Sequence, residues 1–140
     1  MPHSFTDPAV SAAFDAFPES ARAGTLLLRD LILDEAATLP QIGTVQEVLR
    51  WGQPSYITPD RKAATTLRIG THKSAAFAIF AHCQSGVITN YATRFPCWDR
   101  LDGNRAVLFN DLSEVEPFRL GTLIRDALTY HLKSPQTAMA

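Results

Sequence analysis

The chain has 140 residues, of which 46% are hydrophobic and 19% are charged, a composition typical of one globular domain spanning residues 1–140. Its 13 basic and 14 acidic residues leave a formal net charge of -1, so we expect no basic face and no nucleic-acid partner. No apolar run reaches the roughly 18 to 20 residues of a membrane span, and the N-terminus lacks the pattern of a signal peptide. We therefore expect a cytoplasmic protein without a membrane partner.

Two helices are expected near the N-terminus. Thr6 or Asp7 followed by Pro8 predicts a helix start, because the capping side chain accepts a backbone N–H and proline has none to leave unpaired. The range 18–39 has a broad apolar arc and predicts a second helix, which Pro40 ends. Polar residues of that helix fall mostly opposite the arc: Arg22, Thr25, Arg29 and Asp30.

The segment TVQEVLRWG, residues 44–52, has two interpretations. Thr44 with Glu47 three residues later matches the capping box of a short helix. The same residues are also compatible with a strand that leads into the PSYI segment, residues 54–57. We favour a helical turn followed by an extended segment.

Two strands in the middle of the chain are expected to form an antiparallel hairpin. In ATTLRIG, Leu67 and Ile69 alternate with Arg68, which is the pattern of a half-buried strand. AAFAIFAH, residues 75–82, is apolar at successive positions, which is typical of a central strand covered on both faces.

The C-terminal half adds mixed elements and one clear helix. The range 85–96 fits a strand by its alternation and a helix by its apolar stripe, and Ser85 as a cap with Pro96 as a stop favours the helix. Asp102-Gly103 predicts a turn before a short strand. The last helix has a regular apolar stripe: Leu120, Leu123, Ile124, Ala127 and Leu128. Together these elements predict an α+β fold, a small antiparallel sheet packed against N-terminal helices and a C-terminal helix.

The stretches LRWGQPSY, TTLRIG, FAIFAHC, GNRAVLF and LIRDALTYHL occur in this order. In this the chain resembles the YdhG-like family of small bacterial domains of unknown function, from about Phe14 to Leu132. The resemblance implies the same α+β architecture. Some relatives are described as frataxin-like iron chaperones, which implies iron handling by acidic surface residues as an alternative function. Such residues here include Asp99, Asp102, Glu114 and Glu116, although the resemblance assigns none of them as a ligand.

The segment from Trp51 to Tyr56 is the main candidate for a binding site. The two aromatic rings offer apolar area together with an N–H and an O–H, and Gln53 offers both a donor and an acceptor. Gly52 and Pro54 shape the backbone between them. This mixture is typical of a ligand pocket. The alternative is that Trp51 fills the junction between a helix and the sheet.

Cationic residues extend this candidate site. If Arg68 and Arg105 project from the same sheet face, they would form an anion site, because a guanidinium holds a carboxylate or phosphate with two parallel hydrogen bonds. The alternative is that these cations pair with surface acids: Asp99, Asp102 or Glu47. We therefore expect a small-molecule ligand, anionic in the first case, bound by these residues: Trp51, Gln53, Tyr56, Arg68, Lys73 and Arg105.

No motif for catalysis, metal binding or a cofactor is recognisable. The sequence has no C-x-x-C, H-E-x-x-H or H-x-x-H spacing, no G-x-S-x-G turn and no Walker loop. We expect no metal and no cofactor, and either no enzymatic activity or one that no catalytic motif reveals. A third alternative is a homodimer in which Trp51 and Tyr56 are buried against a second copy of the chain.

Overall fold

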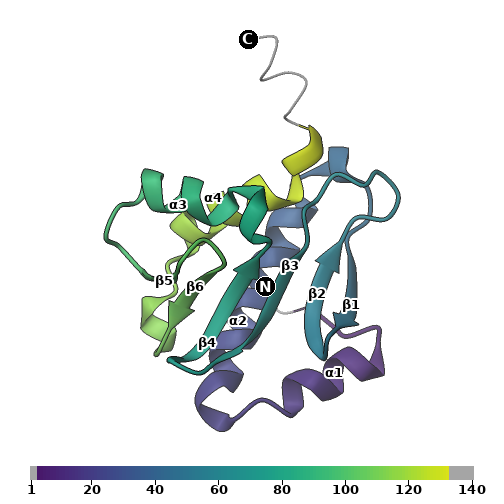
Figure 1. The fold of residues 1–140 in the computed structure, drawn as a ribbon. Coiled ribbons are helices and arrows are strands. Elements are labelled where there is room, and N and C mark those ends of the chain that lie inside the picture. The colour runs from purple at the N-terminus through teal and green to yellow at the C-terminus, as the bar shows by residue number, and fades with distance from the viewer. Residues whose placement is uncertain (1–2, 133–140) are drawn as a thin grey trace.

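The computed structural model describes residues 3–132 (Figure 1). Its α-helices are α1 (Pro8–Asp15), α2 (Glu19–Ala37), α3 (Val87–Arg94) and α4 (Pro117–Leu128). Its strands are β1 (Gln46–Arg50), β2 (Gln53–Ile57), β3 (Leu67–His72), β4 (Ala75–Ala81), β5 (Arg100–Asp102) and β6 (Ala106–Phe109). The α+β fold predicted from the sequence is confirmed, with the N-terminal helices and the C-terminal helix packed against an antiparallel sheet.

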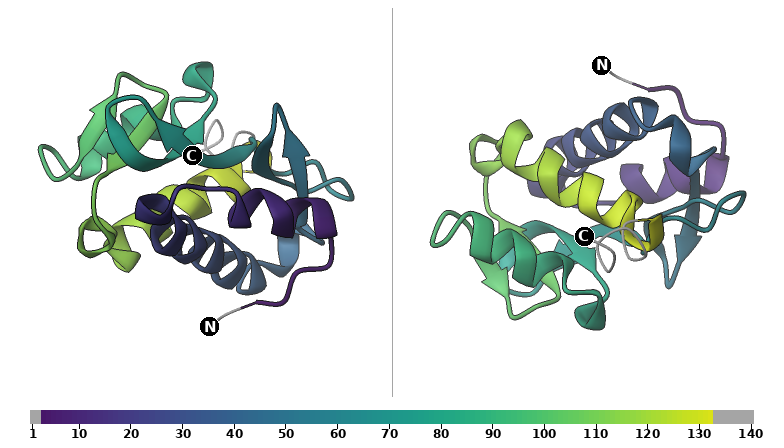
Figure 2. Two further views of the ribbon diagram at one scale, coloured as in Figure 1. Left: turned by 90° about the horizontal axis from the view of Figure 1, so that it is seen from below. Right: turned by 90° about the horizontal axis from the view of Figure 1, so that it is seen from above.

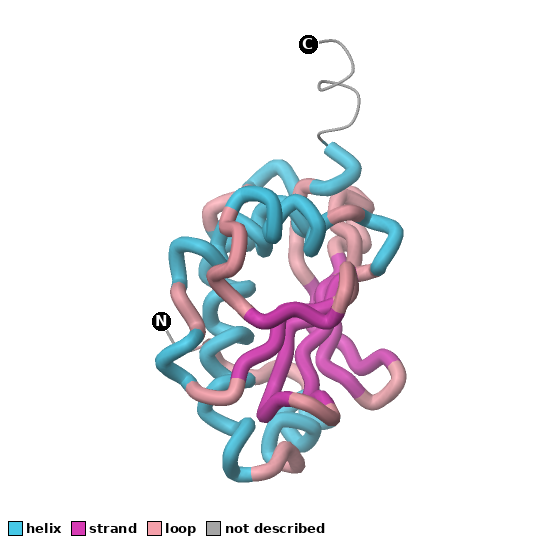
Figure 3. The backbone as a smooth tube through the Cα atoms, turned by 60° about the vertical axis from the view of Figure 1, so that its left-hand side comes forward, coloured by secondary structure: helices cyan, strands magenta, loops and turns pink. Residues whose placement is uncertain are grey.

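The six-stranded sheet has the order β1-β2-β3-β4-β6-β5, and all neighbouring strands are antiparallel. Helix α2 crosses one face behind β3 and β4, and α4 runs beside α2 (Figures 1 and 2). Figure 3 shows most helical segments on one side of the strands. Alternate strand residues such as Leu67 and Ile69 point into the core on the helix side. We call the opposite side the uncovered face.

The uncovered face carries a small apolar cluster separate from the main core. Ala78, Ala106 and Leu108 are its buried members, and Ala75 and Phe80 pack against them. Ala78 and Ala106 are both 0% exposed, although they lie on the side away from α2. Phe80, a longer side chain of the same face, packs against this cluster.

Most elements begin where the sequence predicts. The Asp7 carboxylate accepts a hydrogen bond from the backbone N–H of Ala9 at 2.9 Å, and Pro8 occupies the first turn of α1. In α4, Pro117 occupies the first turn, and the Glu116 carboxylate accepts the backbone N–H of Phe118. The hairpin of β3 and β4 is confirmed, with β4 central in the sheet. The helical interpretation of the segment after Ser85 is also confirmed, as α3.

The expected helical turn after Thr44 is wrong, because residues 46–50 form strand β1. Trp51 and Gly52 connect β1 to β2 with φ values of 52° and 74°. Two successive residues with positive φ are typical of a type I′ hairpin turn, whose twist matches that of the flanking strands. Glu47 makes no helix cap, since its carboxylate is bound by a side chain of α2. Tryptophan is an unusual residue at this turn position, which concealed the hairpin.

Within residues 3–132, no helix combines the length and the apolar character that crossing a membrane requires.

Candidate functional site

Strand alternation divides the predicted site residues between the two faces of the sheet. Gln53 lies on the uncovered face, where it contacts Arg68. Tyr56, three residues later, points to the other face and is 0% exposed. The structure therefore does not bring Tyr56 and Trp51 together, because Tyr56 is buried within the chain whereas Trp51 is exposed. The period of two along a strand was the signal that would have separated Gln53 from Tyr56.

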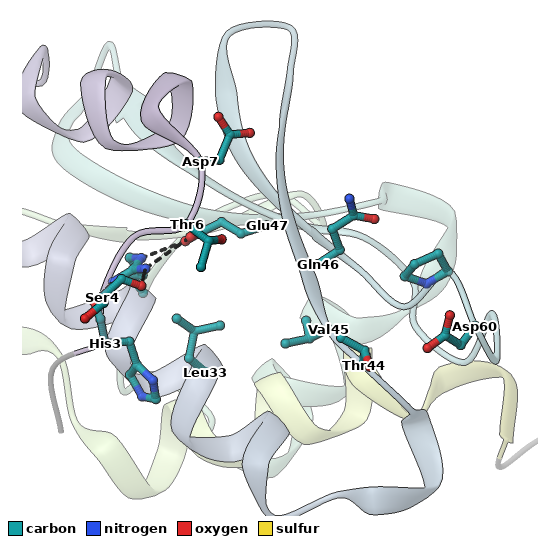
Figure 4. Close-up of a pocket in the computed structure, with 12 residues that line it drawn as sticks. His3, Ser4, Thr6, Asp7, Leu33, Thr44, Val45, Gln46, Glu47 and Asp60 are labelled. Carbon is teal, nitrogen blue, oxygen red and sulfur yellow. Dashed lines mark hydrogen bonds and ion pairs between the residues drawn. The ribbon is translucent and has the colours of Figure 1, made fainter.

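A groove of about 660 Å³ lies between the N-terminal segment 3–7 and β1 (Figure 4). His3, Ser4 and Thr6 line one side, and Val45 and Gln46 line the other. The carboxylate of Glu47 lies at its inner end, where the dashed lines of Figure 4 mark its contacts with Arg29.

Arg29 and Glu47, the buried charged groups of this groove, already have partners in the protein. Arg29 donates to both Glu47 oxygens, at 2.7 and 3.1 Å, and to the backbone carbonyls of His3 and Ser4, at 2.6 and 3.1 Å. The Tyr56 hydroxyl donates to Glu47 Oε2 at 2.6 Å. Burial and the adjacent Glu47 carboxylate raise the pKa of Tyr56, so the phenol stays protonated. We call Arg29, Glu47 and Tyr56 the buried triad.

The buried triad holds three parts of the chain together. The Arg29 and Glu47 side chains are only 3% and 9% exposed, and the Arg29 guanidinium lies 3.7 Å from the centroid of the Phe5 ring. Through these contacts α2 binds both the N-terminal segment and the β1–β2 hairpin. The helical pattern wrongly placed Arg29 on the polar side of α2, and its partner Glu47 was assigned to a helix cap. A structural role accounts for all of these contacts.

A second cavity, of about 350 Å³, lies on the uncovered face. Arg68 from β3 and Arg105 from the β5–β6 turn both line it. Phe80 forms part of its wall, and Asp102 and His82 also border it. The two arginines are therefore brought to one cavity, the condition on which an anion site depends.

Arg68 is held in place by neutral groups rather than by an acid. Its Nη1 donates to Gln53 Oε1 at 2.7 Å, and its guanidinium carbon lies 5.5 Å from the ring centroids of both Trp51 and Phe80. Partial burial lowers the pKa of Arg68, because desolvation disfavours the charged form. Among residues 3–132, no carboxylate forms an ion pair with Arg68 or with Arg105.

Gly70 makes room for this arrangement. A Cβ atom at residue 70 would lie 2.5 Å from Gln53 Nε2 and 3.5 Å from a ring carbon of Phe80. The absence of a side chain thus lets Gln53 lie flat on the sheet, where its amide oxygen meets Arg68. Gly70 is therefore needed for the orientation of Arg68, through Gln53.

Asp102 is the acidic group of the cavity. Nδ1 of His72 accepts the backbone N–H of Ser74 at 3.0 Å, so the neutral ring carries its proton on Nε2, 3.0 Å from Asp102 Oδ2. The hydrogen bond from His72 lowers the pKa of Asp102, and the charges of Arg105 and Lys73 add to the effect. Lys73 itself is exposed in the β3–β4 turn and is not among the residues that line the cavity.

Trp51 is 84% exposed at the tip of the β1–β2 hairpin. Its positive φ is unfavourable for a bulky residue, and such strain costs of the order of 1 kcal/mol or more. A large apolar ring that is both exposed and strained has no evident role in stability, which makes Trp51 a candidate for ligand contact.

In the described part of the chain, no group of three or more His, Cys, Asp or Glu side chains is arranged to hold a metal ion. Comparison of the whole sequence with models of protein families, with curated proteins and with solved structures found no match.

Proposed function

We propose that the protein binds a small anionic molecule in the cavity between Arg68 and Arg105. The observation that carries this proposal is that both guanidiniums line one cavity of about 350 Å³ while neither forms an ion pair with a carboxylate among the described residues. Partly buried charges are normally paired, so the half-buried Arg68 favours an external anion, and the exposed Arg105 adds a second cation at the same cavity.

The contacts of Arg68 suit it to this role. One amino group of the Arg68 guanidinium, Nη1, donates a hydrogen bond to Gln53. The rings of Trp51 and Phe80 lie against the guanidinium and restrict its orientation. The remaining N–H groups stay available for a carboxylate or phosphate, which a guanidinium binds with two parallel hydrogen bonds. Because the group is oriented in advance, binding costs less conformational entropy.

The other lining groups restrict the ligand further. Phe80 offers an apolar wall, and the ionised Asp102 can only accept hydrogen bonds. A ligand that fits the cavity therefore carries one anionic group toward the arginines and a hydrogen-bond donor toward Asp102. Hydroxy acids and sugar phosphates have this chemistry.

The larger groove at β1 is less suited to a ligand. Arg29 and Glu47 saturate each other there, and every buried side-chain nitrogen or oxygen among the described residues has a hydrogen-bond partner. An anion that reached Arg29 would have to displace an existing contact of the buried triad.

The test uses Trp51 as a reporter, because its ring lies beside Arg68. In a Trp98→Phe background the fluorescence of Trp51 is recorded during titration with inorganic phosphate and with glycolate, at constant ionic strength set with chloride. Saturable change is expected, and Arg68→Ala or Arg105→Ala should raise the Kd by about tenfold or more, a loss of about 1.4 kcal/mol.

Arg61→Ala is the matched control, because Arg61 is an exposed cation of the β2–β3 connection beside Gly43. It should leave the titration unchanged. A response that does not saturate, or that is lost equally in Arg61→Ala, would exclude a specific anion site at Arg68 and Arg105.

A further inference from the structure

The uncovered face concentrates positive charge on a chain whose net charge is -1. Arg50 pairs with Gln53 across β1 and β2, so it projects to the same face as Gln53 and Arg68. Arg100 pairs with Leu108, a member of the apolar cluster of this face. The strands thus present Arg50, Arg68 and Arg100 on one side.

The β5–β6 turn adds a further cation to the same face. Arg105 lines the cavity of this face together with Asp102. The acidic residues within the strands are Glu47 and Asp102, and Glu47 points away toward Arg29. Asp102 is therefore the acid that the strands contribute to this face. The basic residues gather on this face only when the chain folds. The nearly equal numbers of basic and acidic residues therefore gave no sign of it in the sequence.

We infer that the uncovered face binds single-stranded nucleic acid. The inference rests on the proposed function, since it makes the anion between Arg68 and Arg105 a phosphate of the strand. Adjacent strands lie about 4.8 Å apart, so Arg50, Arg68 and Arg100 follow one another across the sheet at intervals of about 10 to 14 Å. A linear polyanion crossing the sheet would meet these cations in turn.

Trp51 favours a nucleic acid over other polyanions. Its indole is 84% exposed next to Arg68, and an aromatic ring interleaved with cations is a stacking platform for bases. The ring of Phe80 is less available for stacking with a base, because Arg68 and His72 already lie against it. In a duplex both faces of each base are covered by the neighbouring base pairs, so only an unpaired base can present a face to Trp51, which is why we specify a single strand.

The test is fluorescence anisotropy of a labelled oligothymidine of about eight nucleotides, a length within the site sizes of sheet-based single-strand binders. Thymidine monophosphate, a duplex of equal length and oligoglutamate are the competitors. We expect the oligonucleotide to bind at least about tenfold more tightly than the monophosphate, because one strand engages several cations at once.

Two variants and one control separate the contributions. Arg50→Ala should weaken oligonucleotide binding and make the slope of log K against log salt less steep by about 0.7, the value for one lost phosphate contact on a single strand. Trp51→Ala should weaken binding at least about threefold without changing that slope. Arg61→Ala should change neither quantity.

Each remaining outcome overturns the inference in a recognisable way. If the oligonucleotide binds no better than the monophosphate while Arg68→Ala abolishes both, the small-anion function stands and the strand-binding inference fails. Equal competition by oligoglutamate or by the duplex would show a general polyanion surface instead of one for single strands. Oligonucleotide binding that Arg50→Ala and Trp51→Ala leave intact would place the contact elsewhere. Binding of neither phosphate nor oligonucleotide would contradict both proposals.

Discussion

The hydroxyl of Tyr56 lies 2.6 Å from Oε2 of Glu47, and this contact joins the β1–β2 hairpin to the buried Arg29 of α2. Removing different members of the buried triad should therefore have unequal costs. Tyr56→Phe removes one hydrogen bond to a charged acceptor and should lower the free energy of unfolding by about 1.5 to 3 kcal/mol. Glu47→Ala leaves a buried guanidinium without its acid and should cost about 3 to 5 kcal/mol.

Urea unfolding of the two variants measures both values. The larger loss expected for Glu47→Ala assumes that no other acid binds Arg29, since its remaining acceptors are backbone carbonyls. Equal costs for the two variants would show that the ion pair of Arg29 and Glu47 contributes nothing beyond the phenol contact.

A glycine that faces the core and a glycine on the uncovered face should respond differently to substitution by alanine. At Gly24 of α2, a Cβ atom would lie 2.1 Å from Phe77 Cζ in the core, and at Gly70 it would lie 2.5 Å from the end of the Gln53 side chain. Gly24→Ala should lower the free energy of unfolding by about 1 to 3 kcal/mol through overpacking. Gly70→Ala should change it by less than about 0.5 kcal/mol, because Gln53 can move into solvent.

Gly70→Ala should still weaken phosphate binding, since a displaced Gln53 no longer orients Arg68. Fluorescence titration and urea unfolding on the same samples separate the two effects. A Gly70→Ala variant with unchanged phosphate affinity would show that Gln53 does not position the guanidinium.

Replacing Trp51 should raise or preserve the stability of the fold while it weakens binding. Trp51→Asn creates Asn-Gly, the preferred pair for a type I′ turn, and relieves strain of the order of 1 kcal/mol. The lost contact with the Arg68 guanidinium offsets about 0.5 to 1 kcal/mol of this gain. The variant should therefore unfold at a urea midpoint equal to or above that of the wild type, while its affinity for the oligonucleotide falls. A clearly lower midpoint would assign Trp51 a structural role.

The hydrogen bond from His72 should be visible in the titration of Asp102. It lowers the pKa of Asp102 in the folded protein below the ordinary value of about 3.9. Because the folded pKa is depressed, the stabilisation is present above the unfolded pKa and is lost as the pH falls through the folded pKa. In His72→Ala the pKa should return upward toward about 3.9. Carboxyl carbon NMR measures it, and an unchanged pKa would show that the imidazole does not bind this carboxylate in solution.

Patterns that depend on neighbours in the chain were readable from the sequence. The start of α1 follows from Asp7 and Pro8, and the β3–β4 hairpin and helices α3 and α4 follow from the spacing of apolar residues. The β1–β2 turn was missed because its first residue is Trp51, where asparagine or glycine is usual. The spacing of residues along the chain therefore predicted the elements wherever the turns contained the residue types usual for them.

The candidate site was only partly readable, because its geometry depends on distant segments. The alternation of Gln53 and Tyr56 already implied opposite faces, but residues 46–50 were not recognised as a strand, so the register of the hairpin was unknown. The shared cavity of Arg68 and Arg105 depends on β6 lying between β4 and β5, a sheet order that local patterns do not encode. The pairing of Arg29 with Glu47 likewise joins a helix and a strand through tertiary packing alone.

A double-mutant cycle on phosphate binding tests most directly whether Arg68 and Arg105 hold one anion. The Kd for inorganic phosphate is measured for the wild type, Arg68→Ala, Arg105→Ala and the double variant, with Trp51 fluorescence as the readout. If both guanidiniums contact the same phosphate, each single substitution removes most of the affinity, and the double variant loses little more. We predict a coupling energy of about 1 kcal/mol or more, within the range for groups that share a partner. Losses that simply add, or a single variant that binds phosphate like the wild type, would contradict a shared site.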